Sequence, residues 1–250
     1  ELEAAAAAAP RVWVSRFVDY TSKYGLGFLL NNGSSGVYFN DSTKIVLNPA
    51  GTRFAYVERR RHTPKGSEHL AHYYGIDAYP ADLQKKVTLL KHFHSYLLEQ
   101  EKSEGKEVAA GAAAAPGGEA RPAKAAAKAK GAFKAPAEDV ADADLVFLKK
   151  WVRTRHAILF RLSNRTVQVV FFDQSEVLLS AGAAAVTYVD KQGGRSELTL
   201  AEVLETGRTD VSKRLKYAKD ILAQLIAGVP SGKRSGSGSA SKSKSEEEKH

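Results

Sequence analysis

The chain repeats itself once, and this duplication constrains its fold more than any other sequence feature. Residues 39–46 (FNDSTKIV) align with residues 172–179 (FDQSEVLL) at an offset of 133, and residues 55–58 align with 187–190 at an offset of 132. Each copy contains several short apolar runs separated by turn residues, followed by one amphipathic helix. Two copies of one small α+β unit are therefore expected, rather than a single large domain.

The predicted elements follow the same order in both copies. In the first copy, strands are predicted at 27–30, 36–39, 44–47, 54–57 and 70–74, and a helix with apolar spacings of three and four at 80–101. In the second, strands are predicted at 157–162, 166–172, 176–179, 185–190 and 196–200. Thr209 is a good N-cap for the helix that follows, and Gly228 and Pro230 end it.

Composition divides the chain into five segments. An Ala-rich segment (1–11) precedes the first copy (12–102), an Ala/Lys/Gly-rich linker (103–142) precedes the second copy (143–228), and a Ser/Gly/Lys tail (229–250) is expected to be disordered. A run of basic residues with no acid between them, Arg121, Lys124, Lys128, Lys130 and Lys134, lies in the linker, and further Lys and Arg residues lie in the tail. This location favours solvated segments over a nucleic-acid surface, although binding through the basic linker residues 121–134 remains an alternative.

No catalytic, metal or cofactor site is predicted. The chain has no Cys, which excludes disulfides, thiolate zinc sites and a cysteine nucleophile. The pairs His69/His72 and His92/His94 have no third ligand at metal-site spacing, and no phosphate loop, nucleophile elbow or kinase signature occurs. No run of about 20 apolar residues could cross a membrane. The sequence indicates a binding module without a membrane partner, and its lack of Met indicates a fragment of a longer protein.

Long motifs in both copies resemble the two polo boxes of polo-like kinases. They are WVSRFVDYTSKYGLGF at 13–28, VYFNDSTK at 37–44, WVRTR at 151–155, AAVTYVD at 184–190 and RLKYA at 214–218. The resemblance implies two six-stranded antiparallel sheets, each with one C-terminal helix packed across it. It also implies a pair of boxes that binds phosphoserine or phosphothreonine peptides. In the family, such a pair targets an upstream serine/threonine kinase domain to sites in the cytoplasm and nucleus. These sites are the centrosome or basal body, the kinetochore and the division site.

The resemblance places the phosphate-gripping His and Lys of the family on Ser175 and Val177, so both charged donors are missing. A charge-assisted hydrogen bond contributes about 1.5–3 kcal/mol, so phosphate selectivity should be weakened or absent. Phe17 stands at the family's peptide-contacting Trp. The predicted peptide groove consists of Phe17, Arg153, Val170 and Phe172.

The residues at the family's tyrosine-lined accessory groove match the family pattern more closely than those at the phosphate site. The positions of this groove here are Val18, Asp19, Tyr20, Tyr24, Leu89, His92, Phe93 and Tyr96, and only His92 replaces the usual aromatic residue. These residues could equally serve to pack the helix of the first box on its strands.

Three functions follow from the resemblance. The first is a targeting module that binds protein or peptide partners with weakened or absent phosphate dependence. The second is phosphopeptide binding in which Arg161, Lys91 or Arg153 replaces the lost donors. The third is a structural module that dimerises with a second copy or docks on the upstream kinase domain.

Overall fold

The computed structural model describes residues 9–58, 61–63, 66–109, 127–128, 145–180, 185–205 and 207–227. Most of the N-terminal segment (1–11), most of the linker (103–142) and the whole tail (229–250) lie outside these residues. The expectation that the tail is disordered therefore concerns residues outside the described chain.

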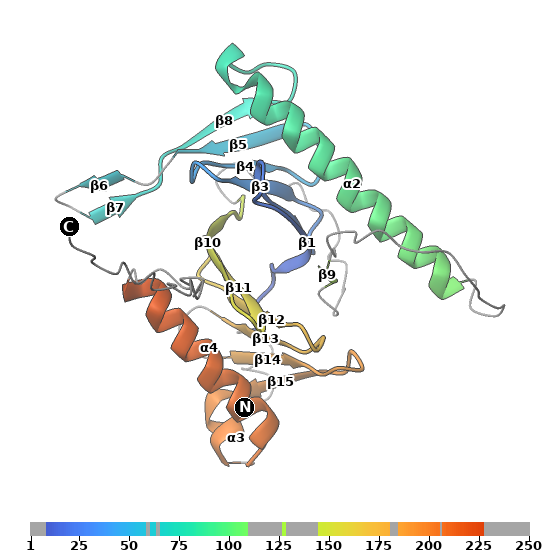
Figure 1. Ribbon diagram of the computed structural model, residues 1–250, viewed down its shortest axis with the longest axis vertical. Helices are drawn as coiled ribbons and strands as arrows, with labels where there is room; N and C mark the ends of the chain where they lie inside the picture. The colour runs from blue at the N-terminus through green and yellow to red at the C-terminus, as the bar shows by residue number, and fades with distance from the viewer. Residues whose placement is uncertain are drawn as a thin grey trace, which may run out of the picture.

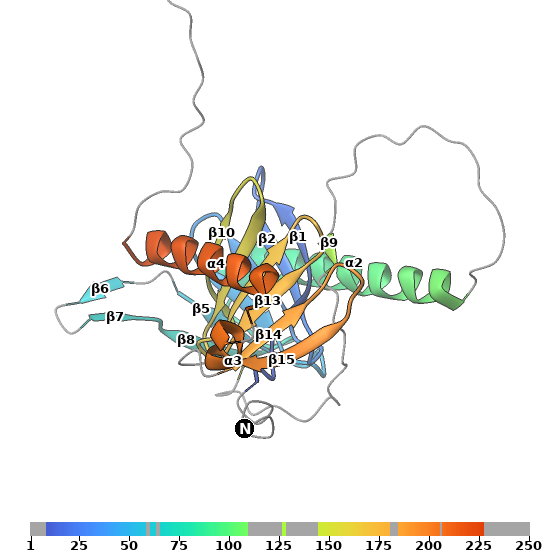
Figure 2. The ribbon, with the colours of Figure 1, turned by 90° about the horizontal axis from the view of Figure 1, so that it is seen from below.

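The first repeat forms one antiparallel sheet in the strand order β8-β5-β4-β3-β2-β1-β9. Its strands are β1 (Val14–Tyr20), β2 (Gly25–Leu30), β3 (Ser35–Phe39), β4 (Lys44–Leu47), β5 (Arg53–Val57), β8 (Ala71–Gly75) and β9 (Ala127–Lys128). A separate hairpin, β6 (Arg61–Thr63) and β7 (Gly66–Glu68), lies between β5 and β8 in the chain and projects from the body of the molecule (Figure 2). The repeat ends with a 3-10 turn, η1 (Ala81–Leu83), and the helix α2 (Gln84–Ala109).

The second repeat forms a six-stranded antiparallel sheet in simple chain order. Its elements are β10 (Leu148–Arg153), β11 (Ala157–Leu162), β12 (Val167–Phe171), β13 (Glu176–Leu179), β14 (Ala185–Val189), β15 (Arg195–Thr199), α3 (Leu200–Glu205) and α4 (Thr209–Ala227). The prediction of two six-stranded antiparallel sheets, each followed by a helix, is confirmed, and the short strand β9 adds a seventh strand to the first sheet beside β1.

Several elements were not predicted from the apolar pattern. The first strand of each repeat, β1 and β10, carries charged residues such as Arg16, Asp19 and Lys150, which obscure the strand signal. The hairpin β6–β7, the short strand β9 and the helix α3 were also missed, and α2 continues to Ala109, beyond its predicted end at 101.

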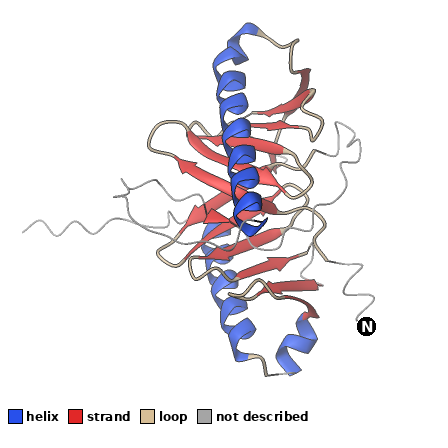
Figure 3. Cartoon of the chain, turned by 90° about the vertical axis from the view of Figure 1, so that its right-hand side faces the viewer, coloured by secondary structure: helices blue, strands red, loops and turns tan. Residues whose placement is uncertain are grey.

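The two sheets pack face to face, and each helix covers the outer face of its own sheet (Figures 1 and 3). Alternate strand residues point to opposite faces, so both faces of the central strands are apolar. The inner layer joins residues of both repeats: Val14, Phe17, Leu26, Phe28, Leu30, Val46, Leu148, Ile158, Phe160, Leu162 and Val170. One shared core therefore fixes the repeats against each other.

Polar contacts also connect the two repeats. The buried side chain of Gln168 in β12 accepts a hydrogen bond from the Val14 amide (2.8 Å) and donates one to the Val14 carbonyl (2.9 Å). Trp13 packs on Leu178 and Val189 of the second repeat, and the Arg195 guanidinium lies 4.9 Å from the centre of its ring. The segment that leads into β1 is thus anchored on the second sheet.

The structure corrects the register of the duplication by one residue. Ser42 and Gln174 both have positive φ (69° and 73°), and each follows an aspartate whose Oδ1 accepts hydrogen bonds two residues on. These paired features place Asp41 on Asp173, an offset of 132, so the offset of 133 inferred for residues 39–46 was wrong. A one-residue shift changes which face of the sheet a side chain occupies. Lys44 therefore corresponds to Glu176 and not to Val177.

Candidate functional site

The two repeats meet at one end of the sandwich through Asp19 and Arg153. Asp19 lies near the end of β1, Arg153 ends β10, and the Arg153 Nη1 donates a hydrogen bond to the Asp19 Oδ2 at 3.2 Å. Burial alone would raise the pKa of Asp19, but hydrogen bonds from Thr21 and the neighbouring Arg153 hold that pKa below its ordinary value. The carboxylate therefore stays ionised and keeps the arginine at the boundary of the two repeats.

Phe172 forms the apolar part of this end. Its side chain is 44% exposed, and the Arg153 guanidinium lies 5.2 Å from the centre of its ring. The Phe172 amide donates to the His156 carbonyl at 3.0 Å, which fixes the start of the turn against the β10–β11 connection. An exposed ring beside a half-exposed guanidinium can hold an apolar or an anionic group of a peptide.

The other two members of the predicted peptide groove lie in the core. Phe17 is 2% exposed and meets Phe160 of the second repeat edge to face, with 5.1 Å between ring centres. Val170 is 3% exposed in the same inner layer. On the backbone edge of β1, β9 pairs at Arg16 and Phe17. Arg153 and Phe172 are thus the members of this set that offer side-chain surface.

Ser175 and Val177, which were matched to the family's phosphate-gripping residues, are both fully buried. The Ser175 amide and hydroxyl donate to the Asp173 Oδ1 at 3.2 and 2.8 Å, so the hydroxyl is engaged within its own turn. Val177 belongs to the apolar layer that includes residues of α4, on the face of the sheet turned away from the first repeat. Neither position presents a donor to a ligand.

Asp173 instead forms an ion pair with Arg214 of α4 and a second one with Lys191 at 3.3 Å. Burial raises the pKa of Asp173, but hydrogen bonds from Ser175 and Arg214 outweigh it and lower the pKa to about 2. The Arg214 guanidinium also lies over the ring of Phe171, 4.2 Å from its centre. This cation fastens α4 to the β12–β13 turn.

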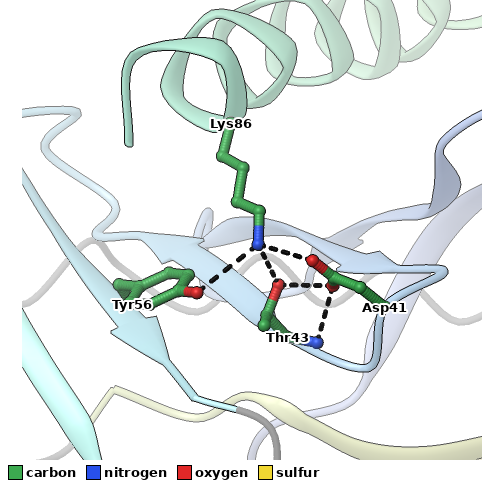
Figure 4. Close-up of polar contacts among 4 residues, drawn as sticks. All are labelled: Asp41, Thr43, Tyr56 and Lys86. Atoms are coloured by element: carbon green, nitrogen blue, oxygen red, sulfur yellow. Dashed lines mark hydrogen bonds and ion pairs between the residues drawn. The ribbon is translucent and has the colours of Figure 1, made fainter. Parts of the chain in front are cut away.

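We call this contact between a helix cation and a turn aspartate a clamp. The first repeat has the corresponding clamp between Lys86 and Asp41, drawn in Figure 4. Lys86 of α2 donates to the Asp41 Oδ2 (2.8 Å), the Thr43 hydroxyl (2.6 Å) and the Tyr56 hydroxyl (3.4 Å), and its Nζ lies 5.1 Å from the ring centre of Phe39. Burial raises the pKa of Asp41, but the bond from Lys86 and those from Thr43 lower it below its ordinary value. The sequence reasoning missed both clamps, although an Asp at the same turn position in each repeat was a usable signal.

The clamp positions α2 across β1 and β2, where the predicted accessory groove lies. Gly27 leaves room for the helix, because a Cβ at this position would lie 2.3 Å from the Phe93 Cδ1. Val18 (1% exposed) and Phe93 (7%) form the packed floor, and Tyr20 meets Phe93 edge to face with 5.7 Å between ring centres. These buried members serve the packing of the helix.

The remaining members form a rim that is open to solvent. Tyr24 is 45% exposed, His92 is exposed, and Tyr20, Leu89 and Tyr96 are half-buried. The Tyr96 hydroxyl accepts a hydrogen bond from the Gln100 Nε2 at 2.8 Å. Asp19 belongs both to this groove and to the Arg153 contact, so the structure joins the accessory groove to the end of the sandwich.

Within the described residues, no group of three His, Asp or Glu side chains lies close enough to hold a metal ion. The same part of the chain holds no helix long and apolar enough to cross a membrane.

Comparisons with known proteins agree with the geometry. The family model described as the POLO box duplicated region matches residues 22–87 and 154–216. A probable serine/threonine-protein kinase CCRP1 of Zea mays is 39% identical over 181 residues, which are 72% of this chain and 24% of the relative. The serine/threonine-protein kinase PLK1 of Xenopus tropicalis is 35% identical over 221 residues, 88% of this chain and 31% of the relative. The chain thus spans about a quarter to a third of these relatives.

Solved structures show the same fold. The polo-box domain of budding yeast Cdc5 in complex with an Spc72 phosphopeptide superposes with a TM-score of 0.61 at 21% identity, over 89% of this chain and 76% of that one. The Cdc5 domain in complex with the Dbf4 polo-interacting region gives a TM-score of 0.61 at 22% identity, over 86% and 72% of the two chains.

Proposed function

The chain belongs to the polo-box family, and from this premise we propose that it binds partner proteins with weakened or absent dependence on phosphate. Polo boxes are non-catalytic binding modules, and the related polo kinases carry their catalytic activity in a separate kinase domain. For a parent protein of this chain we propose serine/threonine kinase activity. We propose targeting by these boxes to cytoplasmic and nuclear sites such as the centrosome or basal body, the kinetochore and the division site.

The observation that carries the proposal is the state of Ser175 and Val177. Both are fully buried, one is bonded to Asp173 and the other lies in the core, and neither is charged. A phosphate group needs charge-assisted donors to offset its loss of water. The proposed ligand surface is instead the rim of the accessory groove together with Arg153 and Phe172, which suits an extended peptide with apolar and aromatic side chains.

Calorimetric titration with a peptide centred on Ser-phosphoThr and with its unphosphorylated twin tests the proposal. We expect the two affinities to differ by less than about tenfold, since two charge-assisted bonds are missing. Phe172→Ala should weaken both peptides, whereas Leu204→Ala, which removes an exposed apolar side chain on α3, should leave both unchanged. A larger preference for the phosphorylated peptide would contradict phosphate independence.

A second candidate is phosphopeptide binding with Arg153 as the replacement cation. It is supported by the guanidinium, which is half exposed and already contacts Phe172. In that case the preference for the phosphorylated peptide should fall as salt rises, and Arg153→Glu should abolish it. Arg161→Glu and Lys91→Glu would locate the site if Arg153→Glu does not.

The third candidate is a structural module that binds a second copy or the upstream kinase domain. A protein that binds neither peptide and shows a concentration-dependent dimer in sedimentation would support self-association.

A further inference from the structure

We propose that the short strand β9 competes with the ligand of the groove: it pairs with the outer edge of β1, and an extended peptide must displace it in order to bind. The regulated site is the groove of the proposed function, on which this inference rests. β9 (Ala127–Lys128) belongs to the linker segment (103–142) and lies beside β1 at the edge of the first sheet (Figure 1).

The fold of a repeat does not require this strand. β1 and β10 are the corresponding first strands of the two repeats, and each has one irregularity in its pairing with the next strand. The irregularity lies between Val14 and Arg16 in β1 and between Leu148 and Lys150 in β10. Within the described chain, no strand pairs with the outer edge of β10, and the second sheet is formed by six strands without one. β9 is therefore an addition to the first sheet.

The alternation of backbone hydrogen bonds identifies the groups at the outer edge of β1. The Leu30 amide donates to the Ser34 carbonyl, so even-numbered residues of β2 direct their backbone groups toward β3 and odd-numbered ones toward β1. The odd-numbered residues of β2 pair with the even-numbered residues of β1 from Arg16 to Tyr20. The backbone groups of Phe17 and Asp19 therefore point away from β2, to the outer edge.

β9 covers one of these two positions. Phe17 pairs with Ala127, and Arg16 pairs with Lys128. Since the backbone groups of Phe17 face outward, Phe17 and Ala127 are the pair whose amides and carbonyls bond to each other. No strand of the described chain pairs with the outer edge at Asp19. One half of this edge is thus covered and the other half is open.

The open half lies within the proposed ligand surface. Asp19 accepts a hydrogen bond from Arg153 at 3.2 Å, and the next residue, Tyr20, belongs to the rim of the groove. A strand rises about 3.3 Å per residue, so the backbone of Asp19 lies only about 7 Å from that of Phe17 along β1. An extended peptide that adds to β1 at Asp19 and continues for two residues toward Phe17 reaches the position of Ala127. Peptide and β9 therefore exclude each other there.

The length of β9 suits a competitor that can be displaced. The strand has two residues and so offers few backbone hydrogen bonds. Residues 110–126 connect it to the end of α2 at Ala109, and a short flexible tether gives an effective concentration in the millimolar range. If β9 covers the edge for about nine-tenths of the time, the apparent affinity of a peptide falls about tenfold.

Removal of the β9 amide tests the competition. Ala127→Pro deletes the amide that faces the Phe17 carbonyl, so the unphosphorylated Ser-Thr peptide should bind about three- to tenfold more tightly in calorimetric titration. Ala127→Ser keeps the amide, and Ala113→Pro introduces a proline elsewhere in the linker. Each of these two controls should change the affinity by less than about twofold, because neither removes a bond to β1.

A cross-link tests the same competition in the opposite direction. Arg16 and Lys128 form the pair that is not hydrogen-bonded, in which Cβ atoms of antiparallel strands lie close enough for a disulfide. The chain has no Cys, so R16C/K128C can form only this disulfide within one chain. The oxidised protein should bind the peptide at least about tenfold more weakly than the same protein after reduction.

Amide hydrogen exchange followed by NMR measures β9 without any ligand. Ala127→Pro should speed the exchange of the Phe17 amide about three- to tenfold, because this amide faces β9. The Val18 amide faces β2 and should exchange at the same rate in both proteins.

The outcomes separate this proposal from the proposed function. Equal peptide affinity for wild type and Ala127→Pro, or for oxidised and reduced R16C/K128C, would overturn the competition and leave peptide binding by the groove in place. Unchanged exchange at Phe17 in Ala127→Pro would overturn the pairing of β9 with β1. A peptide that binds neither wild type nor Ala127→Pro would overturn the proposed function, and the competition with it.

Discussion

Replacing Gln168 by alanine tests the contact that joins the two repeats. The change removes the acceptor of the Val14 amide and the donor to the Val14 carbonyl, as well as a 3.2 Å bond to the Glu176 carboxylate. Leaving a buried polar group without its partner costs about 1–3 kcal/mol. Water that enters the vacated space recovers part of this cost. We expect the free energy of unfolding to fall by about 3 kcal/mol.

Urea denaturation and thermal unfolding measure this loss. For a chain of this size, about 3 kcal/mol corresponds to a fall in Tm of roughly 6–12 °C. Gln192→Ala removes the same side chain from an exposed turn and should change Tm by less than about 2 °C. If Gln168→Ala cost less than about 1 kcal/mol, or no more than Gln192→Ala, the bridge to Val14 would not hold the repeats together as argued.

Three further changes test the elements that position the groove. Asp173→Asn should remove about 1 kcal/mol at neutral pH: lowering the pKa from 3.8 to about 2 corresponds to roughly 2.4 kcal/mol before solvent screening. Because the folded-state pKa is depressed, this contribution is present above about pH 4 and lost as pH falls toward 2. Urea titrations at pH 7 and pH 2.5 should therefore show the difference between wild type and variant falling to about a third in acid, because pH 2.5 still lies slightly above the folded-state pKa of about 2. Lys86→Met should cost about 1 kcal/mol, whereas exposed Lys85→Met should cost nothing measurable in the same assay. Gly27→Ala should cost about 1–3 kcal/mol and weaken groove ligands, because the methyl group displaces Phe93; unchanged stability and binding would refute this close contact.

The pattern of apolar residues correctly predicted the central strands and the two long helices. Strands predicted at 44–47, 157–162 and 176–179 coincide with β4, β11 and β13, because these strands are buried on both faces and read as continuous apolar runs. The helix predicted from Thr209 begins there. Edge elements were harder, since an edge strand such as β10 tolerates lysines that a central strand would exclude.

Side-chain roles at the candidate site depended on contacts between distant residues. Arg153 and Asp19 lie 134 positions apart, and no local pattern in either repeat predicts their ion pair. The same holds for Gln168, which stands in an apolar run and bonds to a backbone segment 154 positions away. Phe17 and Val170, expected to line a groove, are buried because the inner faces of the two sheets close on each other.

The sequence by itself determined the duplication, the order of strands and helix in each copy, the family, and the lack of charge at positions 175 and 177. Each of these properties follows from patterns within short stretches of the sequence. Only the tertiary structure decided which residues are accessible, the offset of 132 between the repeats, and which strands of the described chain lie at the edges of the sheets. The reason is that exposure, register and free edges depend on which faces the sheets bury against each other, and this follows from packing across the whole chain.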